Sequence, residues 1–255
     1  MPSQHQALPQ FITAKWPAPS KIKACTTTRH GGLSKGPYAS LNVNTKGGDD
    51  PQIVAANRDL LKTHLNLPSA PYWLHQVRGA TVVPYNPTNA YPEADGCYAN
   101  EPGQVCAIVT ADCLPILLCA EDKPFVMALH AGWQGLSRNI IAQGLSCAPS
   151  APEKLLAWIG PCVSGAVYEV GADLYELFVS ADADSATYFQ PKTTPNKWLL
   201  DLVGIARLQL ERLGVTKIYG GEWCTLSQPE QFFSYRRDGK ACGGMASLIW
   251  IDEAN

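Results

Sequence analysis

Residues 115–129 read Pro-Ile-Leu-Leu-Cys-Ala-Glu-Asp-Lys-Pro-Phe-Val-Met-Ala-Leu, and this stretch decides the fold. Two apolar runs, 115–119 and 125–129, flank a polar turn, which is the pattern of a β-hairpin. A turn centred on Glu121 and Asp122 fixes how the two strands pair. It places Cys119 opposite Pro124, Pro115 opposite Ala128, and Cys113 opposite His130.

The open end of this hairpin carries the residues that we predict to be catalytic. Directly opposed residues have Cβ atoms about 5 Å apart, so the thiol of Cys113 and the imidazole of His130 can share a proton or a metal ion. Either residue alone has a structural explanation, because cysteine is often a small buried hydrophobe and a histidine ending an apolar strand is often a core group. Their opposition, with Asp112 beside the thiol, favours a functional site.

Composition describes an ordinary soluble globular protein. The 255 residues are 46% hydrophobic and 16% charged, with a net charge of −2, so we expect neither a nucleic-acid partner nor an anionic membrane. No leader-like segment or apolar run of about 20 residues occurs, and nine cysteines without a Cys-x-x-Cys pair fit reduced thiols. We therefore expect a cytoplasmic protein, and composition leaves open whether it is a monomer or a homodimer.

No linker or repeat divides the chain, so we predict a single domain over residues 1–255, with a loosely structured segment at residues 1–20. Strands outnumber helices, and hairpins mix with strand-helix units. This favours an α+β fold with mixed sheets covered by helices. The expected strands are 22–28, 72–76, 80–84, 105–110, 155–159, 217–220, 232–235 and 245–251, and the expected helices are 51–65, 135–147, one through 174–178, and 201–213.

Five segments, collinear over almost the whole chain, carry a resemblance to a known family. They are Arg29–Ser34, Pro37–Asn42, Thr110–Pro115, His130–Trp133 and Phe232–Asp238, and together they resemble the YfiH family. That family is described both as laccase-domain polyphenol oxidases and as purine nucleoside phosphorylases with adenosine deaminase activity, and some members are linked to peptidoglycan precursor editing. The resemblance implies an α/β/β/α layered sandwich that forms one catalytic domain.

The resemblance also implies a zinc site, for which copper is the alternative metal. The family's ligands are His, Cys and His, and the last two fall on Cys113 and His130. The first falls on Arg78, within Gln-Val-Arg-Gly at 76–79, and arginine offers no lone pair to a metal. His75 is the candidate replacement, although its odd offset from residue 78 puts it on the opposite face of a regular strand.

The implied reactions need groups for phosphate, ribose and base. Arginine suits phosphate, so Arg29, Arg58 and Arg78 are candidates, while Asn42 and Gln76 can orient the ribose or the base. A zinc-bound water would account for attack on C6 of adenine. Gln134 and Gly244 stand where the family usually has arginine, so the positive charge of the pocket differs from the family pattern.

The main reaction that the resemblance implies is phosphorolysis of adenosine, inosine or methylthioadenosine. Three other functions are alternatives to it. Cys113 and His130 can form a metal-free cysteine hydrolase or amidase dyad, and the cation of Arg78 would favour its thiolate form. The chain can also be a nucleoside-binding relative without turnover. A multicopper laccase is disfavoured because such an enzyme needs many more histidines than the five present. We predict the phosphorylase, with activity altered by Arg78.

Overall fold

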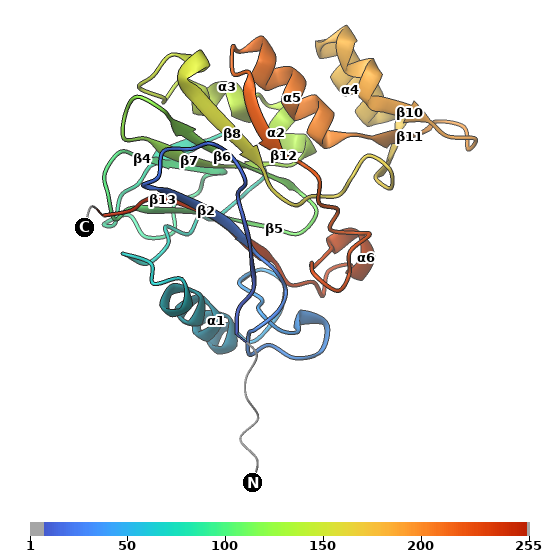
Figure 1. Cartoon of the computed structure of the whole chain (residues 1–255). Helices are drawn as coiled ribbons and strands as arrows, with labels where there is room; N and C mark the ends of the chain where they lie inside the picture. The colour runs from blue at the N-terminus through green and yellow to red at the C-terminus, as the bar shows by residue number, and fades with distance from the viewer. Residues whose placement is uncertain (1–7, 254–255) are drawn as a thin grey trace.

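The computed structural model describes residues 8–253, and Figure 1 shows two sheets stacked face to face between layers of helices. One sheet has six strands in the order β12-β8-β6-β7-β4-β3, and the other has four in the order β1-β2-β13-β5. The α+β class and the α/β/β/α layering predicted from the sequence are therefore confirmed.

The six-stranded sheet contains β3 (Val82–Pro84), β4 (Gly96–Ala99), β6 (Leu114–Ala120), β7 (Val126–Ala131), β8 (Leu155–Ile159) and β12 (Lys217–Gly220). The four-stranded sheet contains β1 (Phe11–Thr13), β2 (Ile22–Thr27), β5 (Val105–Thr110) and β13 (Met245–Ile251). A small third sheet, which the sequence did not predict, pairs β10 (Phe189–Pro191), β11 (Lys197–Leu200) and β9 (Glu169–Gly171).

The helices are α1 (Pro51–His64), α2 (Trp133–Ser137), α3 (Ile140–Leu145), α4 (Ala172–Ala181), α5 (Leu202–Arg212) and α6 (Tyr235–Asp238). Helices α2, α3 and α5 cover the outer face of the six-stranded sheet, and α1 covers the outer face of the four-stranded sheet (Figure 1). Asp50 caps α1 as expected, because its side chain accepts a hydrogen bond from the Gln52 backbone N–H. Among residues 8–253, no helix has the length and apolarity needed to span a bilayer.

One hydrophobic core lies between the two sheets, and a larger one lies between the six-stranded sheet and its helices. Leu117 and Ala128 on β6 and β7 pack with Ile108 on β5 and Ile249 on β13. All seven residues of β6 are buried, because the strand is paired on both edges and covered on both faces. This explains why its sequence is a continuous apolar run rather than an alternating one.

The β6–β7 hairpin forms, but its register differs by two residues from the prediction. Pro115 pairs with His130 and Cys119 with Val126, so Cys113 is not directly opposite His130. Pro124 has no N–H to donate to a ladder, and residues 121–124 instead form a four-residue loop. A shift of two residues leaves every side chain on its expected face, so the thiol and the imidazole still point the same way.

Three other local predictions were wrong. The expected helix 135–147 is broken into α2 and α3 because Asn139 adopts a left-handed conformation, with φ 61°. Residues 232–235 are not a strand, since the Ser234 side chain caps α6 by accepting a hydrogen bond from the Arg237 N–H. The segments 72–76 and 80–84 contribute only β3 and isolated bridges at Tyr72 and His75.

Two further predictions concern the N-terminal segment and the cysteines. Of the segment expected to be loose, residues 1–7 lie outside the described residues, whereas 11–13 form β1, which pairs antiparallel with the end of β2. The edge strand β1 is short, as edge strands commonly are. All nine cysteines are free thiols.

Replacement of Leu117 tests the packing between the sheets. Leu117→Ala removes a fully buried side chain, so we expect the free energy of unfolding to fall by about 3 kcal/mol. The matched control is Leu177→Ala on α4, where the side chain is 43% exposed, and we expect a change below about 0.5 kcal/mol. Urea denaturation of both variants gives the comparison, and equal losses would contradict the core assignment.

Candidate active site

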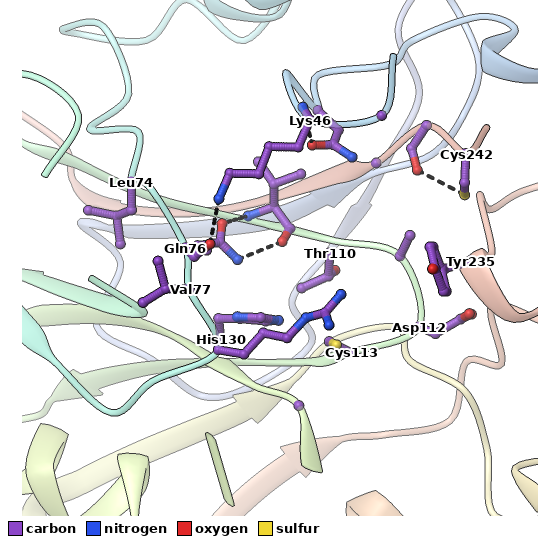
Figure 2. Close-up of a pocket in the computed structure, with 18 of the residues that line it drawn as sticks. Lys46, Leu74, Gln76, Val77, Thr110, Asp112, Cys113, His130, Tyr235 and Cys242 are labelled. Carbon is purple, nitrogen blue, oxygen red and sulfur yellow. Dashed lines mark hydrogen bonds between the residues drawn. The ribbon is translucent and has the colours of Figure 1, made fainter. Parts of the chain in front are cut away.

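A cavity of about 850 Å³ opens where the ends of β5 and β7 meet, and Figure 2 shows many of the residues that line it. Its walls come from the loop 44–47, the turn 76–78, the loop 110–113 and the segment 235–244. Six of the predicted site residues line it, namely Arg58, Gln76, Arg78, Asp112, Cys113 and His130. Arg29, Asn42 and His75 are not among the lining residues.

Cys113 and His130 meet because the residue opposite Cys113 has no side chain. In the observed register that residue is Gly132, and His130 is the diagonal neighbour of Cys113. A Cβ atom added to Gly132 would lie 2.8 Å from Cys113 Sγ and 3.7 Å from His130 Nε2. The sulfur and the imidazole therefore share the space that the glycine leaves open.

A buried carboxylate orients His130 from the side away from Cys113. Asp95 has no exposed surface, and its Oδ1 lies 2.8 Å from His130 Nδ1. Burial lowers the pKa of His130, but the charge of Cys113 and the hydrogen bond with Asp95 outweigh this effect and raise that pKa to about 9. The raised pKa favours the imidazolium form of His130, whose Nε2 is on the thiol side.

The same carboxylate organises the turn that carries Arg78. Asp95 accepts hydrogen bonds from the backbone N–H groups of Val77 at 3.2 Å, Arg78 at 2.9 Å and Gly79 at 2.6 Å. Burial raises the pKa of Asp95, but its hydrogen bonds to His130 and to these amides hold that pKa below the ordinary value. Sequence reasoning missed Asp95, because its local sequence does not distinguish it from a surface acid such as Glu93, two residues earlier.

Asp112 lies at the cavity wall, but its carboxylate faces structural partners. Its Oδ1 accepts from the Thr225 hydroxyl at 2.6 Å, and its Oδ2 accepts from the Ser234 hydroxyl at 3.0 Å and from the Arg236 backbone N–H at 2.6 Å. Asp112 also has φ 83°, a left-handed conformation that aspartate tolerates better than most residues. These bonds give Asp112 the role of holding the loop before Cys113 rather than that of a proton carrier.

Gln76 and Arg58 are also committed to the protein itself. The Gln76 amide bonds to both backbone groups of Val109, with its Nε2 donating to the carbonyl and its Oε1 accepting from the N–H, each at 2.8 Å. Arg58 donates two hydrogen bonds to the Val43 carbonyl and lies 4.1 Å from the centre of the Trp73 ring. Gln76 therefore fixes the turn 76–79 beside β5, and Arg58 contributes charge to the wall.

Two predicted substrate-binding residues are structural parts of neighbouring loops. Arg29 donates to the carbonyls of Ala39 and Pro229. Asn42 is fully buried, and its side-chain oxygen accepts from the backbone N–H groups of Asn44 and Gly244. Both side chains use their donors and acceptors to hold loops together, which explains why these motifs are polar although they do not line the cavity.

The donor set does not fit the three-ligand zinc site that the family resemblance implies. His75 stacks on Tyr91, its Nδ1 is 4.0 Å from a Glu93 oxygen, and it is absent from the cavity lining. Across residues 8–253, no three His, Cys, Asp or Glu side chains gather as a metal site would require. Cys113 and His130 offer two donors, one short of a catalytic zinc site.

Several lining residues were not predicted from the sequence. Among the described lining residues, the cations are Lys46, Arg58, Arg78, Arg236 and Lys240, and the one carboxylate is Asp112. The guanidinium of Arg236 lies 4.9 Å from the centre of the Tyr168 ring. Lys46, Arg236 and Lys240 were not among the predicted site residues, and the cavity is therefore more strongly positive than the sequence suggested.

Comparison with known proteins identifies the family to which this chain belongs. The family model described as multi-copper polyphenol oxidoreductase laccase matches residues 23–252. The curated purine nucleoside phosphorylase YfiH of Shigella flexneri is 44% identical over 95% of this chain and 99% of its own length, and that of Escherichia coli is 43% identical over the same shares. A crystal structure from Neisseria meningitidis, with a TM-score of 0.90, is 40% identical over 95% of this chain and 99% of that one. The chain therefore belongs to the YfiH, or laccase-domain, family.

Proposed function

We propose that this protein is a purine nucleoside phosphorylase that cleaves adenosine, inosine or methylthioadenosine with phosphate. The observation that carries the proposal is the buried His130–Asp95 pair at the floor of a cavity whose charged lining is mostly cationic. The curated relatives named as purine nucleoside phosphorylases support the same activity. A cationic wall suits phosphate, and a positioned imidazolium suits a leaving purine.

The reaction exchanges one bond at C1′ of the ribose for another. The C1′–N9 bond breaks, its electron pair goes to the purine, and a phosphate oxygen forms the new bond to C1′ through a transition state resembling the oxocarbenium ion of glycoside cleavage. The imidazolium of His130 donates a proton to the departing purine. The proton released by the phosphate then returns His130 to its charged form, so protons balance over one turnover.

The other residues of the site position these groups. Asp95 stabilises the charged ring of His130 and fixes which nitrogen faces the cavity. Asp112 holds the loop that presents Cys113, and Gln76 holds the turn of Arg78 against β5. No step is assigned to a metal, because the described donors do not complete a three-ligand site.

A phosphate-dependence assay tests this proposal. We expect purine release from inosine or adenosine to require phosphate and to yield ribose 1-phosphate. Asp95→Asn is expected to lower kcat about 100-fold, because it removes the charge that supports the imidazolium. Asp122→Asn, in the hairpin loop, is the control and keeps wild-type kcat. Purine release that ignores phosphate, or no turnover of any of the three nucleosides, would overturn the proposal, and the latter would favour a binding protein.

A second candidate function uses the same residues without phosphate. Cys113 beside His130, with Asp95 on the far ring nitrogen, has the order of nucleophile, base and orienting acid found in cysteine hydrolases. Cys147 and Cys224 are the other partly exposed thiols, so the distinguishing measurement is alkylation by iodoacetamide in a Cys147→Ser, Cys224→Ser background, followed by assays for amide hydrolysis and phosphorolysis. If the dyad is catalytic, the rate of amide hydrolysis falls in proportion to the fraction of Cys113 that is labelled. Absence of any amide hydrolysis by the unlabelled protein rules this function out.

Adenosine deaminase activity is the third candidate, and Arg78 is the residue that tests it. Histidine tolerates the left-handed conformation that Arg78 adopts, with φ 61°, so Arg78→His can add a third donor beside Cys113 and His130 without refolding the turn. We expect zinc per chain, measured by mass spectrometry of the purified protein, to rise from well below one to near one, with a gain in ammonia release from adenosine. Stoichiometric zinc in the wild type would show that our ligand assignment is wrong.

A further inference from the structure

The hydroxyl of Thr110 is a polar group in the cavity that the function above leaves unused. Thr110 ends β5 and is 3% exposed, and its Oγ1 has no hydrogen-bond partner among the described residues. Buried hydroxyls in native proteins nearly always have a partner. Because Thr110 lines the cavity, the missing partner is best supplied by a bound ligand.

The surroundings of Thr110 point to the part of the cavity where the reaction would occur. In Figure 2, Thr110 lies between Gln76 on one side and Asp112 with Tyr235 on the other, and above Cys113 and His130. The neighbouring polar groups are already used, because both backbone groups of Val109 bind the Gln76 amide. The Thr110 hydroxyl is therefore the uncommitted donor at this end of β5.

Arg78 is one of two cations lining the cavity, Lys240 being the other, whose side chains have no polar or aromatic partner among residues 8–253. Its guanidinium makes no hydrogen bond or ion pair with another residue between 8 and 253, whereas Arg58 is bound to Val43 and Lys46 to the Gln76 carbonyl. Its backbone is fixed by Asp95 on one side and by Arg138, which donates to the Arg78 carbonyl, on the other. Gln76, two residues earlier, ties this turn to Val109, the neighbour of Thr110.

We propose that the Thr110 hydroxyl and the Arg78 guanidinium form the subsite for inorganic phosphate. A guanidinium fork binds two phosphate oxygens, and a hydroxyl donates to a third. An anionic ligand fits this wall better than a neutral ribose hydroxyl, since five cations line the cavity and the carboxylate of Asp112 is bound by Thr225, Ser234 and Arg236. The inference rests on the proposed phosphorylase function and names the residues that hold its second substrate.

Isosteric replacement of Thr110 tests the subsite. Thr110→Val removes the hydroxyl and keeps the side-chain shape, whereas Thr110→Ser keeps the hydroxyl. We expect Thr110→Val to raise the KM for phosphate about ten- to one-hundredfold while the KM for inosine changes less than about twofold. Thr110→Ser should stay within about threefold of wild type. Thr194→Val, on an exposed turn beyond the cavity, is the matched control and should change neither constant.

Calorimetric titration with inorganic phosphate alone separates this inference from the proposed function. If the wild type binds phosphate and Thr110→Val weakens binding at least tenfold, the subsite stands even where no nucleoside is cleaved. An unchanged phosphate affinity in Thr110→Val, beside an active wild type, overturns the subsite and leaves the phosphorylase function intact. A rise in the inosine KM alone also overturns it, because the hydroxyl would then bind the sugar.

Discussion

The hydrogen bond between Asp95 and His130 is the contact on which the arrangement of the site depends. One carboxylate, without exposed surface, binds the imidazole and three consecutive backbone amides. It therefore fixes the ring at the end of β7 and the turn of Arg78 in a single unit. A buried carboxylate needs such partners, because an unpaired charge in the interior is very costly, and here those partners are the parts of the site.

The hairpin, the long helices and the buried strands could be predicted because their signals are local. Continuous apolar runs marked β5, β6 and β8, and Asp50 with Pro51 marked the start of α1. The meeting of Cys113 with His130 followed from the same reasoning, even though the pairing was displaced by two residues. It survived because a shift of two preserves the face of each side chain, and because Gly132 leaves room for the diagonal contact.

The failures have a different physical origin. Arg29 and Asn42 have the polarity of ligand-binding residues, but their hydrogen bonds hold loops together. Asp95 and Thr110 were instead missed, because nothing in the local sequence distinguishes a buried acid or hydroxyl that serves a site from one on the surface. Their roles arise from contacts between segments far apart in sequence, such as that between Asp95 and His130. That contact is set by the antiparallel pairing of β4 with β7 in the six-stranded sheet, which no window of sequence contains.

The unequal burial of the cavity walls also determines how a substrate can enter. The floor is attached to β6 and β7, whose residues are all buried, whereas Lys46, Tyr235 and Lys240 on the opposite wall are exposed. Separating the two sheets would disrupt the core between them, but displacement of the exposed loops would not. A ligand should thus enter and leave through the loop side, while Cys113 and His130 remain on a rigid base.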